Sequence, residues 1–328
     1  MSLTLMTPLT KLKSSTCAAA TFIALGLFTA ATPAVADDLA IETVRLAKAD
    51  LGTRSDGLGI VSDSAERMQI AGELRTLTQQ IAAASCALAT EIETDSTRDV
   101  LRQSISDFNR NLTALRDGDA QLDIAAPESR YETLAQLDEI RDEWNVVQIA
   151  AAGILASEDQ AMHRQVVEDR TAKLLELTNL LAAVITSQYA YPHEITTADA
   201  LMIEFAGRQQ MLSQKMAHVA CLVWHENGTA ESRDSLRETM QLFEASLNAL
   251  RHGMPESGVH GAPNAKIRAD LDGLLDRWVT IKSNSEALLS SDELNQAQSA
   301  MVYQNIEVSL AAFDGLLHDY KEYAERAH

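Results

Sequence analysis

The sequence repeats itself at a spacing of 135 residues, and this duplication limits the folds open to the chain. Ala71-Gly72 returns as Ala206-Gly207, and Arg98-Asp99-x-Leu-Arg returns as Arg233-Asp234-x-Leu-Arg. Other residues recur in the same order: Leu77, Gln79, Ala82, Cys86, Phe108 and Gly118 return as Leu212, Gln214, Ala217, Cys221, Phe243 and Gly253. After a one-residue deletion, Trp144 returns as Trp278. The chain therefore contains two copies of one unit.

Each copy has a helical pattern. Apolar residues recur at steps of three and four, strand-type alternation is scarce, and only 14 Gly and 6 Pro occur in 328 residues. The pattern predicts four helices per copy, at residues 62–92, 97–117, 130–156 and 159–189, then 197–227, 231–252, 265–289 and 292–326. Short links between antiparallel helices are typical of up-down bundles. The predicted fold class is all-α, with two tandem up-down four-helix bundles.

The breaks between helices predict the domain organisation. Tyr191-Pro192 marks a join, because proline disfavours helix at the residue before it. We therefore expect a first bundle within residues 37–190, preceded by an extra helix near 38–51, and a second bundle within 191–328. Capping-box patterns predict that the fourth helices start after Ser157 and Ser290. Trp144 and Trp278 are expected to be core or interface anchors.

Residues 1–36 have the pattern of an export signal. Lys11 and Lys13 precede a short apolar stretch, and Ala34-Val35-Ala36 has the small-x-small pattern of a cleavage site. The alternative is an uncleaved anchor, although the apolar stretch is short for a bilayer span. No later segment approaches eighteen consecutive apolar residues. We expect a soluble mature protein that starts at Asp37 and is periplasmic.

Charge and motifs exclude several function classes. The net charge of -20 argues against nucleic acid, whose affinity for proteins depends mostly on neutralised phosphates. The sequence has no nucleophile elbow, phosphate-binding glycine loop or zinc-protease motif, so we expect neither an enzyme nor a cofactor. His218 and His225 share one helix, but without a third ligand they are a weak metal signal, and no metal site is predicted.

Residues 206–217 read Ala-Gly-Arg-Gln-Gln-Met-Leu-Ser-Gln-Lys-Met-Ala, and the first copy begins Ala-Gly-Glu-Leu-Arg at residue 71. The later segment resembles the signature of the PilJ/NarX-like sensor family, extracytoplasmic four-helix domains of chemotaxis transducers and nitrate-responsive histidine kinases. The earlier segment resembles the nitrate-sensing form, Ala-Gly-x-Leu-Arg. The resemblance covers most of both copies and implies a ligand-binding sensory module.

The resemblance also implies a ligand site. In nitrate-sensing relatives, the arginine three positions after the glycine binds the anion at a dimer interface. The matching positions here are Arg75, after Gly72, and Gln210, after Gly207. The two copies could form an internal pseudo-dimer that brings both positions onto one axis. A guanidinium suits a planar oxyanion such as nitrate or nitrite, because its donors form a planar fork.

The pair departs from the family pattern, because Gln210 stands where a second arginine would be. Two guanidiniums about 6 Å apart would repel by roughly 3 kcal/mol, and an anion would relieve that repulsion. With Gln210, one arginine must hold the charge, and Arg208 and Lys215 could compensate. Alternatively, Arg75 pairs with a carboxylate, such as Glu66, Glu73 or one from another helix.

Cys86 and Cys221 each lie eleven residues beyond the arginine or glutamine position, close to three helical turns away. If that face meets its twin across a pseudo-axis, the two can form a disulfide in an oxidising compartment. The alternative is two buried free cysteines in an alanine-rich helix end.

Two functions follow. The first is a periplasmic sensory module for nitrate or nitrite that docks to a membrane-bound histidine kinase, chemoreceptor or anion transporter. The second is a helical scaffold or interaction protein without a small ligand, in which Gly72 and Gly207 serve close backbone packing alone.

Overall fold

The computed structural model describes residues 63–92, 94–189, 196–226, 228–255, 258–291 and 293–326. The predicted export signal, the extra helix near 38–51 and the join at Tyr191-Pro192 lie outside these residues. The boundary between residues 190 and 191 therefore stays a prediction. Within the described part of the chain, no helix is both long enough and apolar enough to cross a membrane.

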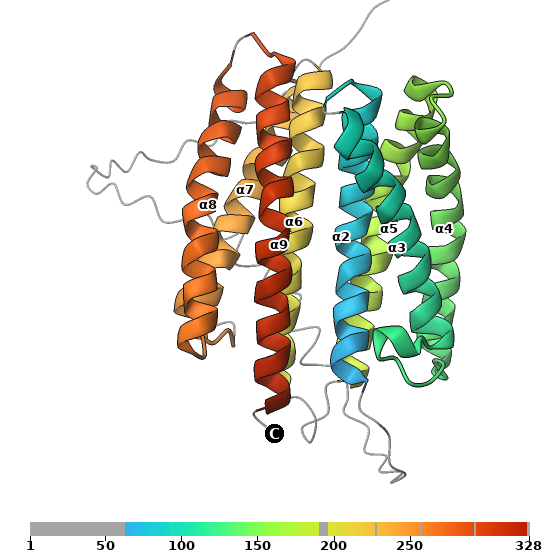
Figure 1. The fold of residues 1–328 in the computed structure, drawn as a ribbon, viewed down its shortest axis with the longest axis vertical. Helices are drawn as coiled ribbons and strands as arrows, with labels where there is room; N and C mark the ends of the chain where they lie inside the picture. The colour runs from blue at the N-terminus through green and yellow to red at the C-terminus, as the bar shows by residue number, and fades with distance from the viewer. Residues whose placement is uncertain are drawn as a thin grey trace, which may run out of the picture.

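Eight α-helices fill the described residues, four in each copy (Figure 1). The first bundle consists of α2 (Ser64–Ala89), α3 (Thr94–Asp117), α4 (Tyr131–Leu155) and α5 (Gln160–Tyr189), with a short 3-10 turn, η1 (Ala120–Leu122), between α3 and α4. The second bundle consists of α6 (Thr197–His225), α7 (Ala230–His252), α8 (Ala265–Ser290) and α9 (Gln296–Arg326). In each bundle, consecutive helices pack together and the fourth closes on the first. This confirms the all-α class and the two four-helix bundles.

The second helix of each bundle ends at an equivalent glycine. Gly118 and Gly253 have φ angles of 81° and 87°, a left-handed conformation that glycine adopts without a Cβ penalty. A small antiparallel bridge follows in each copy: Asp119 with Ile124, and Met254 with Val259. The repeat in sequence is thus a repeat in backbone structure, down to the links.

The capping boxes predicted at Ser157 and Ser290 are wrong. Ser157 has a φ of 59° and lies in the link after α4, which ends at Leu155, and Ser290 is the last residue of α8. The carboxylate of Asp159 instead accepts a 3.2 Å hydrogen bond from the third backbone N–H of α5. At α9, the side chain of Asn295 accepts an equivalent bond of 3.1 Å. Neither serine caps the helix that follows, because α5 begins only at Gln160 and α9 only at Gln296.

The repeated aromatic residues form the centre of each core. Phe108 stacks on Trp144 with ring centroids 4.1 Å apart, and Phe243 lies 4.8 Å from Trp278. The Trp144 ring is buried, and its Nε1 donates a 2.9 Å hydrogen bond to Asn109. Pairs of this kind add about 1 kcal/mol beyond the apolar area that they bury. The prediction that both tryptophans are anchors is confirmed.

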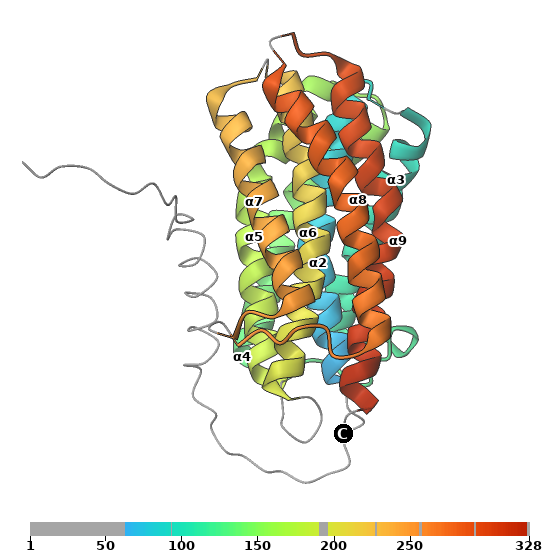
Figure 2. The same cartoon turned by 90° about the vertical axis from the view of Figure 1, so that its left-hand side faces the viewer.

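The two bundles meet where α2 packs against α6 (Figures 1 and 2). Apart from four residues on one narrow stripe, every residue of α2 from Ser64 to Leu88 is buried, and small side chains such as Ala82, Ala83 and Ala84 are fully buried. Cys86 and Cys221 form a disulfide across this seam, with their Cα atoms 6.3 Å apart. Gly72 and Gly207 also lie together, in one pocket. Because equivalent residues meet at two levels, α2 and α6 run in the same direction.

The disulfide makes stability sensitive to reduction. It closes a loop of 135 residues, so removing it should cost up to about 5 kcal/mol of unfolding free energy on chain-entropy grounds. We expect the melting temperature to fall when a reductant is added. In a variant with Cys86→Ser and Cys221→Ser, the reductant should have no effect. Equal sensitivity of both proteins would contradict the bridge, as would a mass of the unreduced protein showing two free thiols.

Candidate functional site

A small pocket lies at the contact between α2 and α6, here called the seam. It is lined by Gly72 and Gly207, the two glycines of the repeated signature. Its walls come from four helices and are formed by Met68, Gln69, Gly72, Arg75, Thr186, Ile203, Glu204, Gly207 and Leu317. The enclosed space has room for about one water molecule. The structure therefore places Gly72, Arg75 and Gly207 at one pocket, whereas Gln210, which was expected to meet Arg75, is not among the lining residues. A nitrate ion is larger than this space, so it would need a side chain to move.

Glu204 occupies the guanidinium fork of Arg75. Arg75 is buried, with 3% of the residue exposed, and its Nη2 donates a 2.8 Å hydrogen bond to Glu204 Oε2. Nη1 donates to the other carboxylate oxygen, which completes a bidentate pair between α2 and α6. Arg75 was expected either to bind an anion or to pair with a carboxylate. In the structure it pairs with a carboxylate, which belongs to the other copy.

The charges around Glu204 keep it ionised. Burial would raise the pKa of its carboxyl group, but the charge and hydrogen bonds of Arg75 and the charge of Arg208 outweigh burial. The net effect holds the pKa of Glu204 below its usual range. The seam therefore contains a compensated ion pair.

The signature glycines differ in what they permit. A Cβ at Gly72 would lie 3.2 Å from Arg75 Nη2, closer than most such contacts, so glycine leaves room for the guanidinium. At Gly207, the nearest atom to a Cβ would be Arg75 Nη2 at 3.8 Å, an ordinary contact. Gly72 is thus tied to the position of Arg75, whereas Gly207 is not required by it.

Gln210 has a different partner. It is buried, and its Nε2 donates a 2.5 Å hydrogen bond to Asp314 Oδ1 on α9. Its position in the repeat matches Arg75, but its amide is engaged within the second bundle. The residue that faces Arg75 is Glu204, six positions earlier.

Glu204 was not among the residues singled out in the sequence, although the repeat contains a signal for it. The repeat aligns Glu204 with Gln69, and Gln210 with Arg75. One copy therefore has the cation and the other has the anion on the same helix face. Comparing the charges of the two copies at neighbouring positions, and not only at the arginine, would have suggested the pair.

Arg208 and Lys215 lie on a partly exposed face of α6, away from the pocket wall. Burial and the charge of Arg208 lower the pKa of Lys215, while Glu238 on α7 opposes the shift. His218, one turn further along, is 7% exposed, and its Nε2 has no hydrogen-bond partner. Burial, together with Lys215, lowers the pKa of His218 to about 4, so its ring is neutral at pH 7.

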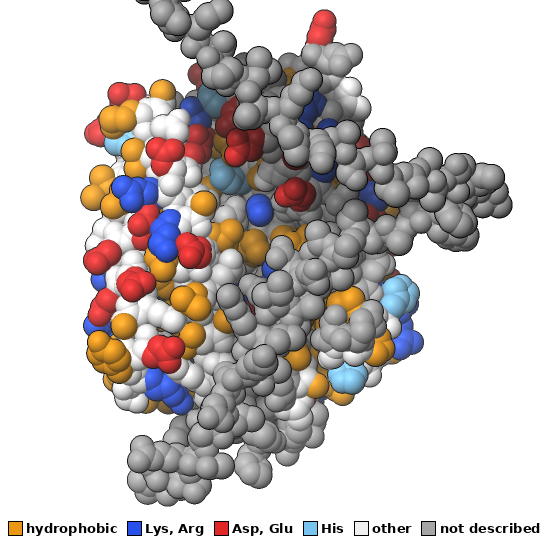
Figure 3. All heavy atoms as spheres, turned by 180° about the vertical axis from the view of Figure 1, so that it is seen from behind, with side chains coloured by type: hydrophobic (Ala, Val, Ile, Leu, Met, Phe, Trp, Pro, Cys, Tyr) orange, Lys and Arg blue, Asp and Glu red, His pale blue; other side chains and the backbone are white. Residues whose placement is uncertain are grey.

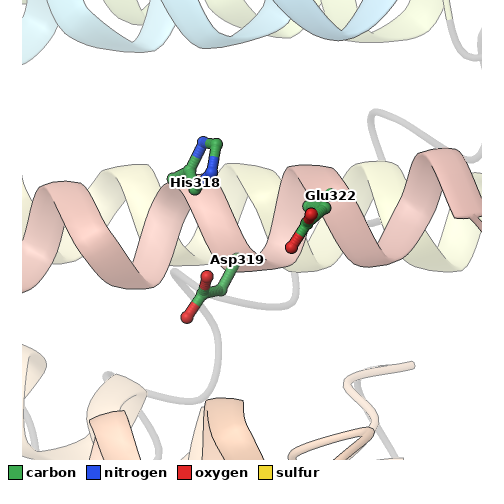
Figure 4. A group of neighbouring side chains, drawn as sticks. All are labelled: His318, Asp319 and Glu322. Atoms are coloured by element: carbon green, nitrogen blue, oxygen red, sulfur yellow. The ribbon is translucent and has the colours of Figure 1, made fainter.

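A group of potential metal ligands that sequence reasoning missed lies near the end of α9. His318, Asp319 and Glu322 offer ligand atoms within 4.8 Å of one another (Figure 4). The ammonium group of Lys266 already contacts the Asp319 carboxylate, and burial of Asp319 is offset by that contact, which lowers the pKa of Asp319. A lysine in this place competes with a cation, so the group receives no functional assignment.

Two comparisons with known proteins bear on the chain. A family model described as PilJ, type IV pili methyl-accepting chemotaxis transducer N-term, matches residues 61–169 and 195–303. The two matches together cover more than half of the chain, and each includes the whole of a signature helix, α2 or α6. The comparison with curated proteins found none that matches.

Replacing Arg75 by Ala should destabilise the protein by about 3 kcal/mol at neutral pH, because it leaves the Glu204 carboxylate unpaired at the seam. The lowered pKa of Glu204 means that the pair stabilises the fold above the pKa of an unfolded glutamate, and that this stabilisation is lost as the pH falls through the folded value. The deficit of the variant should therefore shrink as the pH falls into the range where the Glu204 carboxylate is protonated. Denaturant unfolding across pH measures both effects.

Two controls accompany this variant. Adding Glu204→Gln to Arg75→Ala should recover part of the lost stability. Replacing Arg102, whose side chain is 61% exposed in its pair with Asp99, should change stability by less than about 1 kcal/mol. Equal losses of unfolding free energy for Arg75→Ala and the Arg102 variant would show that the buried pair stabilises the fold no more than an exposed pair does.

Proposed function

The chain belongs to the PilJ family, and on that premise we propose that it is a sensory module in which one chain supplies both halves of a paired receptor domain. Membership in this family indicates a signalling sensor module that is typically non-catalytic. It also implies association with a chemotaxis transducer or another signalling system. The proposal adds a ligand, a location and a membrane-bound partner.

The observation that carries the proposal is the packing of α2 on α6. Both signature helices lie at one seam, run in the same direction and are joined by the disulfide of Cys86 and Cys221. A bound ligand at this seam would contact both copies at once. A shift between the two helices would then be the signal that a partner reads.

The candidate ligand is a small planar oxyanion, nitrate or nitrite, at Arg75. A nitrate presents two oxygens to a guanidinium much as a carboxylate does. It would therefore compete with Glu204, and the exchange would break the link between α2 and α6. Glu204 gives up the fork most readily when it is protonated, because an ionised carboxylate without a partner is costly to bury. Anion binding at Arg75 is thus expected to take up a proton.

Thermal shift with nitrate, nitrite, sulfate and acetate tests this ligand. At a hundred times its dissociation constant, a ligand stabilises the folded state by about 2.7 kcal/mol. We expect nitrate affinity to rise by about tenfold for each unit of decrease in pH, as for binding coupled to uptake of one proton. The Glu204→Gln variant should bind more tightly and without this pH dependence. Nitrate affinity that is unchanged in Arg75→Ala would eliminate the site.

A second function is favoured by one observation. Glu204 already fills the fork of Arg75, and the pocket has room for about one water molecule. This is what a helical scaffold without a small ligand would need, since the pair then serves packing alone. Absence of a shift with any of the four anions at every pH, in both the native protein and Glu204→Gln, would favour the scaffold.

We further propose that the protein is exported to the periplasm and docks there to a membrane-bound partner: a histidine kinase, a chemoreceptor or an anion transporter. The pattern of residues 1–36 supports export, and so does the disulfide, because disulfides persist in oxidising compartments.

Export predicts a defined mature end. Protein recovered from the periplasmic fraction of a bacterial host should begin at Asp37, as read by N-terminal sequencing. Replacing Ala34 and Ala36 by Leu should block cleavage and retain the full chain. An intact N-terminus in the native protein would contradict cleavage.

A further inference from the structure

The wall of the Arg75 pocket is built largely from equivalent residues of the two copies. Three pairs in it lie at the spacing of the repeat: Met68 with Ile203, Gln69 with Glu204, and Gly72 with Gly207. The fourth helix of each copy adds one further residue, Thr186 from α5 and Leu317 from α9. The first copy therefore contributes a hydroxyl group from its fourth helix, whereas the second contributes an apolar side chain.

These two residues reach the pocket from different sides. Figures 1 and 2 show α9 on one side of the seam and α5 on the other. The α5 side is the one that Figure 3 views, where hydrophobic and charged side chains lie close together between the two bundles. The pocket thus has an apolar wall at Leu317, on the α9 side, and a polar wall at Thr186, on the α5 side.

The hydroxyl group of Thr186 differs from those of the other threonines in its helix. α5 has three threonines, all of them buried. The hydroxyl groups of Thr171 and Thr178 donate to the carbonyl oxygens four residues earlier, at 2.7 and 3.0 Å, as is common for threonine within a helix. Thr186 is 6% exposed, and among the described residues its hydroxyl group makes no hydrogen bond. A buried residue in the pocket wall therefore has an unused donor.

Arg75 also has an unused donor. Its two Nη atoms donate to Glu204, but its Nε is buried and has no hydrogen-bond partner. Buried donors without a partner are costly, and proteins seldom keep them without a reason. Arg75 and Thr186 line one space with room for about one water molecule, so both lie close to anything bound there. The pocket thus has one charged and one neutral group with donors that the fold does not use.

This pair of donors fits an anion with three oxygens in a plane. When such an anion takes the place of the Glu204 carboxylate, two of its oxygens accept from the guanidinium fork. The third oxygen points away from the guanidinium and needs a donor of its own. Thr186 is the one residue with a hydroxyl group in the pocket wall, and the amide nitrogen of Gln69 already donates to Glu73 at 2.9 Å. Nitrite lacks a third oxygen, and acetate has a methyl group in its place.

We infer that Thr186 determines the specificity of the Arg75 site, because its hydroxyl group donates to the third oxygen of a planar anion held in the guanidinium fork. The site then takes planar oxyanions of single charge with three oxygens, of which nitrate is one, in preference to nitrite and to carboxylates. This inference rests on the proposed function, since it requires an anion at Arg75. It deepens that function by naming the class of ligand and the residue that selects it.

The helix supplies matched variants for the test. Thr186→Val removes the hydroxyl group and keeps a branched side chain of similar size, so α5 should still pack. Thr186→Ser restores the hydroxyl group. Thr178→Val is the control, because Thr178 is a buried threonine of the same helix that does not line the pocket. Titration calorimetry of the disulfide-bonded protein at one pH, with nitrate, nitrite and acetate as separate probes, measures the affinity of each variant.

We expect the native protein to bind nitrate at least tenfold more tightly than nitrite or acetate. In Thr186→Val, nitrate affinity should fall by about tenfold, as for loss of one hydrogen bond to a charged group, while affinity for nitrite and acetate hardly changes. Thr186→Ser and Thr178→Val should keep the preference for nitrate.

Two outcomes separate this inference from the proposed function. Nitrate binding that is lost in Arg75→Ala but shows the same preference over nitrite in the native protein and in Thr186→Val would overturn the inference alone. The same holds if the native protein binds the three probes equally and Arg75→Ala binds none. If no probe binds, or if binding is unchanged in Arg75→Ala, both the proposed ligand site and the inference are wrong.

Discussion

The contact between α2 and α6 is the constraint on which the rest of the molecule depends. Each of these helices belongs to its own bundle and also to the seam, so it is buried on nearly every side. Helices in that position cannot show the one-sided apolar stripe of a surface helix. They need small residues where backbones approach, which explains the alanines of α2, and they need any charge to be paired. The disulfide and the pair of Arg75 with Glu204 meet these demands.

Fusion of two copies into one chain changes what such a seam can contain. In a symmetric dimer, a residue on the axis faces its own copy, so an arginine there meets an arginine. In this chain the equivalent positions have diverged: Gln69, Glu73 and Arg75 in the first copy stand against Glu204, Arg208 and Gln210 in the second. A cation can then face an anion. The same divergence leaves Glu73 partly exposed on α2, where the equivalent residue of α6 is Arg208.

Much of this architecture could be predicted from the sequence, because it depends on periodicity and repetition. The eight helices and the two tryptophan anchors follow from patterns within one helix or between equivalent positions. The helix caps were predicted wrongly, since Ser157 and Ser290 match the local capping pattern, whereas α5 and α9 begin later and are capped by Asp159 and Asn295. Glu204 was missed because its role depends on which residue of α6 faces Arg75, and the repeat alone matches Arg75 with Gln210.

The position of the disulfide has a mechanical consequence. Cys86 and Cys221 lie near the C-terminal ends of α2 and α6, whereas the N-terminal end of α2 at Ser64 is 22 residues, or about 33 Å, away. The disulfide therefore fixes the two helices to each other at their C-terminal ends. A small rotation about it hardly moves the sulfurs, but it spreads the opposite ends most. Arg75 and Glu204 lie between the disulfide and the N-terminal ends of α2 and α6, so their ion pair opposes this separation of the helices.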